Sequence, residues 1–192
     1  MFKIILLLMA YLSLNANMWK NTKYDLYFIK EYNSQFYFYK DIYNYKIIKA
    51  QSMQESRLNP EAKSPVGAFG LMQFMPLTAK QISKELNINI SKPEAIPELA
   101  IKMGVYYDRK LLNSWKSERT TESRYKLMFA SYNAGIGNLL KAQKLCNEKK
   151  LDKCNEYTTI ENQLEFITGK YSHETKTYNK RIFEYYTKLN LL

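Results

Sequence analysis

Residues 55–75 read ESRLNPEAKSPVGAFGLMQFM, and the rest of the chain is best interpreted outward from this stretch. Its first residue, Glu55, ends a segment whose spacing is helical. The core-facing positions of that segment fall near one helical face: Ile47, Ile48, Ala50, Gln51 and Gln54. Four helix-breaking residues follow at Pro60, Pro65, Gly67 and Gly70. The pattern therefore predicts a helix over 44–55 that ends at an acid, followed by a loop over 56–75.

Beyond this loop the sequence predicts further helices joined by short connections. Pro76 suits the first turn of a helix to about Leu86, and Pro93 and Pro97 open a long helix to about Asn113. Helical spacing recurs over 121–132, 138–146, 160–168 and 174–190, and Gly135 and Gly137 are expected to separate the first two of these. Repeated helices with short connections indicate one mostly α domain.

The N-terminal region divides into two further segments. Residues 1–16 contain an apolar run from Ile4 to Leu14, too short to span a bilayer comfortably, which is typical of a signal peptide. A buried N-terminal helix is the alternative. Residues 17–41 are rich in Tyr and Phe, and we expect a strap that packs on the domain formed by residues 42–192. After signal cleavage no stable membrane insertion is expected, because no later run approaches 18 apolar residues.

Composition and charge limit the classes of function. The chain has 192 residues, of which 46% are hydrophobic and 15% aromatic, so it can bury a sizeable core. Its net charge of +11 arises from 29 Lys and Arg against 18 acids, which favours an acidic partner. The basic-aromatic motifs of nucleic-acid modules are missing from the sequence, so we expect no nucleic-acid binding.

The two cysteines predict a disulfide rather than a metal site. Cys146 and Cys154 flank a polar, Lys-rich segment, and in an exported protein they would close a short surface loop. Two free thiols are the alternative. The only histidine is His173, and the cysteine spacing is not that of zinc sites, so no metal is expected.

Glu55 is placed to act as a proton donor. An acid at a helix end beside apolar residues such as Leu71 and Met72 can be kept protonated by desolvation. The side chains of Ser64 and Gln73 offer hydrogen bonds nearby. Glu61 is interpreted as a solvated loop charge, and Asp108 as a solvated charge on a helix face.

Two further motifs place polar groups at helix ends. Tyr132 and Asn133 precede Ala134-Gly135, where a helix is expected to end. Glu174 and Tyr178 are four residues apart and therefore share one helical face. Considered separately, the first motif is more simply explained by a helix C-cap, and the second by a solvated helix face.

Together, and in this order, the three motifs resemble those of the soluble lytic transglycosylases, the catalytic domain related to goose-type lysozyme. The matching residues are Glu55-Ser56 with Gly67 through Gln73 and Pro76, then Tyr132-Asn133-Ala134-Gly135, then Glu174-Thr175 with Tyr178. The resemblance covers about residues 42–188, and the long fixed spacing of the first motif makes it the most specific.

The resemblance implies a mostly α, lysozyme-like single domain with a substrate groove, in an exported protein of the periplasm or cell envelope. It implies cleavage of peptidoglycan between N-acetylmuramic acid and N-acetylglucosamine, with 1,6-anhydro ends, with Glu55 as the single general acid/base and without a cofactor. This interpretation also allows for a partner among the protein assemblies of the cell envelope. The residues that the resemblance places along the groove are Ser64, Gly70, Leu71, Met72, Gln73, Tyr132, Asn133, Ala134, Glu174 and Tyr178. Tyr132 is expected to hold Glu55 or the N-acetyl group, and Glu174 and Tyr178 to lie nearer the peptide-bearing side.

Two other functions stay open on the sequence alone. A hydrolytic muramidase on the same fold would need a second carboxylate to activate water, and Glu61 or Asp108 would have to reach the site. A non-catalytic wall-binding module would have the same fold without activity.

Overall fold

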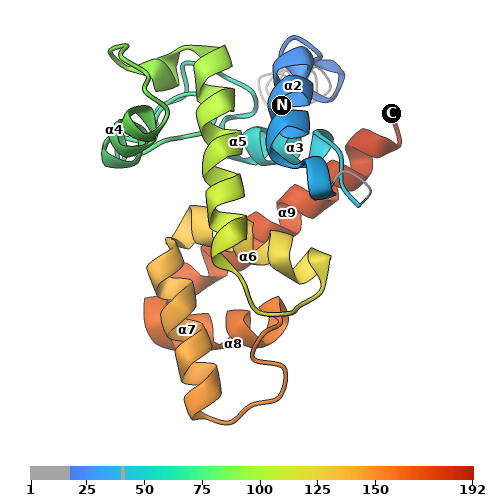
Figure 1. Ribbon diagram of the computed structural model, residues 1–192, viewed down its shortest axis with the longest axis vertical. Coiled ribbons are helices and arrows are strands. Elements are labelled where there is room, and N and C mark those ends of the chain that lie inside the picture. Colours follow the sequence, from blue (N-terminus) through green and yellow to red (C-terminus); the bar gives the residue numbers. More distant parts are fainter. Residues whose placement is uncertain (1–17, 40–41) are drawn as a thin grey trace, which may run out of the picture.

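The computed structural model describes residues 18–39 and 42–192 (Figure 1). The predicted signal peptide, residue 17 and residues 40–41 at the end of the predicted strap lie outside the described residues. Secondary structure in the described part consists of α-helices and short 3-10 turns. Its elements are α2 (Asp25–Gln35), η1 (Tyr37–Tyr39), α3 (Lys46–Ser56), α4 (Pro76–Glu85), η2 (Pro93–Ala95), α5 (Pro97–Ser114), α6 (Thr121–Ala134), α7 (Ile136–Glu148), α8 (Tyr157–Thr168), η3 (Gly169–Tyr171) and α9 (Ser172–Asn190).

The helices pack around two apolar clusters that meet at α6. The larger cluster joins α2, α3, α5, α6 and α9, and the smaller one joins α6, α7 and α8 with Trp115. Figure 1 shows the long α5 running from the α4 end of the molecule towards the end formed by α7 and α8. Helix α3, which carries Glu55, packs against α9. The acid therefore lies where α3 meets the C-terminal helix.

The Tyr-rich segment contributes directly to the core. Phe28, Tyr32 and Phe36 are fully buried, and the hydroxyls of Tyr32 and Tyr125 lie 3.1 Å apart. Helix α2 is also tied to α3 by an ion pair in which Lys49 Nζ lies 2.6 Å from Asp25 Oδ1. This segment therefore packs on the larger cluster.

Most predicted helix ends agree with the structure to within a few residues, with one clear exception. Gly137 lies inside α7, so Gly135 alone separates α6 from α7. Gly135 has φ 81°, which a glycine adopts without the steric cost of a side chain. The prediction that both glycines interrupt the helix was wrong for Gly137. A glycine in the first turn of a helix lowers helix stability only slightly when the neighbouring residues are packed against the rest of the protein.

A disulfide joins α7 to the loop that follows it. Cys146, in the last turn of α7, is joined to Cys154 by a disulfide that closes a short loop, with 5.7 Å between the Cα atoms. Among residues 18–39 and 42–192, none of the helices has the length and apolar character needed to cross a bilayer.

Candidate active site

Glu55 lies in the last turn of α3, at the point where the chain leaves the helix. Arg57 and Leu58 follow with φ 55° and 61°, so two left-handed residues turn the backbone sharply into the loop. Part of the Glu55 side chain is exposed, whereas Met53 on the same helix is buried. The helix end therefore presents one carboxyl group at the boundary between core and solvent.

The loop after α3 is held by its own side chains. Ser52 and Ser56 of α3 both donate hydrogen bonds to Leu71 O, at 3.0 and 2.8 Å. Gln73 Nε2 donates to the carbonyl oxygens of Ala62 and Gly70, at 3.0 and 2.9 Å. These contacts fold the loop back on α3, so that Leu71 and Met72, each 0% exposed, pack beneath it.

Several loop residues that were predicted to bind substrate instead make hydrogen bonds or close contacts that stabilise the loop itself. The Ser64 hydroxyl accepts a hydrogen bond from Ala68 N–H at 2.9 Å, and both Nε2 bonds of Gln73 go to the backbone. Gly70 has φ 80°, and a Cβ atom added there would lie 2.2 Å from Glu94 O of η2. Gly70 is therefore required by close backbone packing.

Tyr178 of α9 holds the carboxyl group of Glu55. Its hydroxyl donates a hydrogen bond of 2.6 Å to Glu55 Oε1. Tyr178 is 4% exposed, and burial, reinforced by the charge of Glu55, raises its pKa well above the ordinary value. It therefore stays protonated and acts as a donor to Glu55.

Tyr132 has a different contact from the one expected. Its hydroxyl donates to Met72 O at 2.7 Å, and so fastens the loop to α6. Its ring packs on Tyr107, with 5.4 Å between centroids. Tyr132 was expected to hold either Glu55 or the N-acetyl group of the substrate; in the structure the contact with Glu55 is made by Tyr178. The order of the motifs in the sequence does not show which of the two helices, α6 or α9, brings its tyrosine closer to Glu55.

The second and third motifs are joined through Asn133. Its Nδ2 donates to Glu174 Oε1 at 3.3 Å, and its Oδ1 accepts from the hydroxyl of Thr175 at 2.7 Å. These residues border a surface hollow of about 390 Å³. The hollow is lined by Asn133, Ala134, Asn138, Ile167, Thr168, Tyr171, Glu174 and Thr175. Sequence reasoning missed Thr175 as a bonding partner, although it stands directly after Glu174 in the third motif.

The surroundings of Glu55 favour its protonated form. Burial of the carboxyl group is the largest effect, and together with the nearby charge of Glu174 it raises the pKa of Glu55 to about 8. The hydrogen bond from Tyr178 acts in the opposite direction, because it stabilises the carboxylate. At neutral pH the acid therefore carries a proton and can donate it.

The two other acids considered from the sequence lie in different surroundings. Glu61 is exposed on the loop, which confirms its interpretation as a solvated charge. Asp108 is 0% exposed, so its interpretation as a solvated helix-face charge was wrong. It occupies a core-facing position of α5, four residues after the buried Gly104. Residues four positions apart share a helical face, so this spacing in the sequence indicated a buried position for Asp108.

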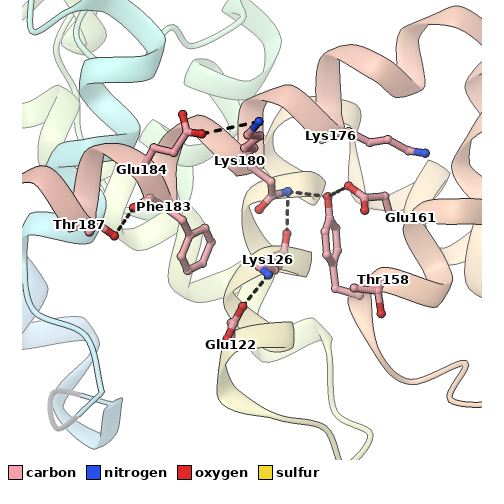
Figure 2. A pocket seen from close by; sticks show the side chains of 11 residues that line it. Glu122, Lys126, Thr158, Glu161, Lys176, Lys180, Phe183, Glu184 and Thr187 are labelled. Atoms are coloured by element: carbon pink, nitrogen blue, oxygen red, sulfur yellow. Dashed lines mark hydrogen bonds and ion pairs between the residues drawn. The ribbon is translucent and has the colours of Figure 1, made fainter.

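A second hollow lies on a different face of α9 and is built from charged residues (Figure 2). Its volume is about 430 Å³, between α6, α8 and α9. Lys126 pairs with Glu122, and Lys180 with Glu184, so much of its charge is balanced within the wall. In the described part of the chain, no group of three His, Cys, Asp or Glu side chains is arranged to hold a metal ion.

The described residues have a mostly α, lysozyme-like fold, in which Glu55, an acid with a raised pKa, lies at a helix end. The model of the transglycosylase SLT domain family matches residues 33–155 of this chain. The chain belongs to that family.

Individual relatives support the assignment. Membrane-bound lytic murein transglycosylase F from Photobacterium profundum is 28% identical over 152 residues, which cover 78% of this chain and 28% of that protein. The protein of the same name from Shewanella woodyi is 32% identical over 124 residues, which cover 65% of this chain and 24% of the relative. This chain thus spans about a quarter of the length of these curated relatives.

Two solved structures share the fold. The 70 kDa soluble lytic transglycosylase SLT70 from Escherichia coli matches with a TM-score of 0.64 and 26% identity, over 88% of this chain and 24% of that one. An inactive mutant of lytic transglycosylase Slt from Pseudomonas aeruginosa matches in fold with a TM-score of 0.65 and 24% identity, over 87% of this chain and 24% of that one.

Proposed function

We propose that this protein is a lytic transglycosylase that cleaves the glycan strands of peptidoglycan, with Glu55 as its general acid and base. The observation that carries the proposal is the hydrogen bond of 2.6 Å from Tyr178 to a Glu55 whose pKa is raised to about 8. An acid that is protonated at neutral pH, yet has a donor ready for its anion, suits both halves of such a reaction. Family membership and the names of the relatives support peptidoglycan as the substrate.

The reaction needs one acid used twice. Glu55 donates its proton to the glycosidic oxygen between N-acetylmuramic acid and N-acetylglucosamine as the bond to C1 breaks. The hydrogen bond from Tyr178 stabilises the carboxylate that is formed. That carboxylate then takes the proton of the muramyl C6 hydroxyl, whose oxygen bonds to C1 and closes a 1,6-anhydro ring. Glu55 ends the cycle protonated, and no water is consumed.

The other motif residues fall into two groups in this proposal. Gly70, Leu71, Met72 and Gln73 shape the loop beside Glu55, and Ser64 closes its outer turn. Asn133, Ala134 and Glu174 line the hollow of about 390 Å³, where they would contact substrate next to the acid. A groove that continues from this hollow past Glu55 is part of the proposal.

A second candidate function is hydrolysis of the same bond. The observation that favours it is Glu174, an exposed acid whose charge contributes to the raised pKa of Glu55 and which could serve as the second carboxylate. Of the acids first considered for this role, Glu61 is exposed on the loop and Asp108 is fully buried. The two reactions differ in their products.

Mass spectrometry of the fragments released from purified peptidoglycan tests the proposal. We expect anhydromuramyl ends with the unchanged protein and with Glu61→Gln, an exposed acid of the same loop. Glu55→Gln is expected to release no fragments. Reducing muramyl ends would instead assign hydrolysis. A folded protein that binds peptidoglycan and releases nothing would be the wall-binding module, and would overturn the proposal.

The proposed substrate places the protein in the cell envelope. Export would follow from the predicted signal peptide over 1–16, and the disulfide between Cys146 and Cys154 suits an oxidising compartment. The glycan strand is the proposed partner, and the net charge of +11 would draw the protein towards acidic wall polymers.

A further inference from the structure

Tyr171 is an exposed aromatic residue in the wall of the hollow of about 390 Å³, and it belongs to none of the three motifs. Its side chain is 64% exposed. The reaction proposed above gives it no role. Ligand sites commonly combine aromatic surface with a few placed polar groups, and the other walls of this hollow supply polar groups of that kind.

A glycine turn places Tyr171 at the start of α9. Gly169 ends α8 with φ 56° and ψ −134°, a conformation that glycine adopts without the steric cost of a side chain. The chain then passes through η3, and Tyr171 and Ser172 both have right-handed helical angles. The helical path of α9 therefore already begins at Tyr171. Lys170 Nζ lies over the ring, 5.5 Å from its centre, and leaves the second face of the ring for a ligand.

Tyr171 is in line with the residues of α9 that lead to Glu55. Three residues share its helical face, at spacings of three, four and seven positions: Glu174, Thr175 and Tyr178. Tyr178, at the far end of this line, donates the hydrogen bond of 2.6 Å to Glu55. Seven helical residues correspond to about 10 Å along the axis. Tyr171 therefore lies about two turns from the residue that holds the acid, on the same side of α9.

The polar groups of the hollow retain hydrogen-bonding capacity. Asn133 Nδ2 carries two hydrogens, and its contact of 3.3 Å with Glu174 uses one of them. Glu174 is exposed, and its carboxylate can accept further bonds beside this one. By contrast, the Thr168 hydroxyl and the Asn138 amide donate to backbone carbonyl groups. The hollow thus offers an aromatic surface, an amide donor and a carboxylate acceptor.

These three groups match the two kinds of surface that a sugar ring presents. A pyranose has a face of C–H groups, which packs on aromatic rings, and an edge of hydroxyl and amide groups. We propose that Tyr171 is a platform on which a sugar of the glycan strand stacks, while the polar edge of that sugar bonds to Asn133 and Glu174. The position of Tyr171 along α9 makes it a positioning residue for a sugar beside the cleaved bond. This inference rests on the proposed function for the identity of the ligand, an N-acetylated glycan.

Binding of chitopentaose, a soluble chain of N-acetylglucosamine, to Glu55→Gln tests the platform without cleavage. Isothermal titration calorimetry gives the Kd for this parent and for Tyr171→Ala and Tyr171→Phe made in it. We expect Tyr171→Ala to raise Kd about tenfold or more, because it removes the stacked ring. Tyr171→Phe keeps the ring and should stay within about twofold of the parent. Phe166→Ala, which removes an exposed ring of α8 outside the hollow, is the matched control and leaves Kd in place.

Three results of this titration would overturn the platform. The first is an equal Kd for Tyr171→Ala and its parent, and the second is a parent that does not bind chitopentaose. The third is a soluble stem peptide whose binding depends on Tyr171 while that of the oligosaccharide does not, because the hollow would then be a peptide site.

Kinetics on soluble glycan strands separate positioning from a structural role. With Glu55 intact, Tyr171→Ala should raise KM about tenfold and leave kcat within a few fold, because a platform binds the substrate and the transition state alike. A loss of kcat at unchanged KM, or a lowered melting temperature that accounts for the lost activity, would contradict the assignment. If the unchanged protein released no fragments while chitopentaose binding still depended on Tyr171, the proposed function would fail and the sugar platform would stand.

Discussion

The hydroxyl of Tyr178 lies 2.6 Å from Oε1 of Glu55, although 123 positions separate the two residues in the sequence. The bond joins the C-terminal helix to the last turn of α3. It stabilises the ionised form of an acid that burial otherwise keeps protonated. This contact opposes the larger effect of burial and so makes it easier for Glu55 to release its proton.

Tyr178→Phe should lower activity and move its alkaline limit to higher pH. Removal of the donor destabilises the carboxylate, so the pKa of Glu55 rises above about 8 and the protonated form persists further. The rate should fall about tenfold or more, because hydrogen bonds to charged groups are worth about 1.5–3 kcal/mol. The pH profile of fragment release measures both effects. Tyr27→Phe, on an exposed tyrosine of α2, is the control, and a shift of the limit to lower pH would contradict the assignment.

Tyr132→Phe should weaken the fold and leave the alkaline limit in place. The lost bond to Met72 O is between neutral groups and fastens the loop, so we expect a decrease of about 1–3 kcal/mol in the free energy of unfolding. Urea denaturation measures it. A change in the pH limit as large as that of Tyr178→Phe would show that Tyr132, too, acts on Glu55.

Gly70→Ala should destabilise the protein strongly. The added Cβ would meet Glu94 O at 2.2 Å on a residue with φ 80°, so the loop and η2 would have to separate. We expect a loss of at least about 2 kcal/mol, in the range of strained positive-φ sites and overpacked contacts. Gly137→Ala is the matched control. A Cβ atom added at Gly137 in α7 would meet no other part of the protein within 4 Å. This substitution should therefore leave the free energy of unfolding unchanged or raise it by up to about 1 kcal/mol. Equal thermal stability of the two variants would refute the steric argument.

Replacement of both Cys146 and Cys154 by serine should lower stability without changing the site. Opening this short loop costs about 2–3 kcal/mol on the loop-entropy account. Thermal melting of the variant, beside the unchanged protein with and without a reductant, measures the effect. If the reductant lowered the melting temperature of the double variant as much as that of the unchanged protein, the disulfide would not be the cause.

The helical layout and the position of Glu55 at a helix end could be predicted from local signals, whereas its role as the acid stays a prediction. Pro76 and Pro97 begin helices where expected, and Gly135 ends α6. These residues act through their own backbone preferences, which depend little on distant contacts. Glu55 was identified from the fixed spacing of its motif. The error at Gly137 shows the limit of such signals, since a glycine can remain helical where the neighbouring residues stabilise the helix.

The sequence by itself determined which residues belong to the motifs, where most helices begin and end to within a few residues, and that Glu55 stands at a helix end. Only the tertiary structure decided that Tyr178, not Tyr132, bonds to Glu55, and that Asp108 is buried in the core. The physical reason is that local spacing fixes the face of a helix on which a side chain lies. The helix that packs against this face is chosen by burial of apolar surface summed over the whole chain.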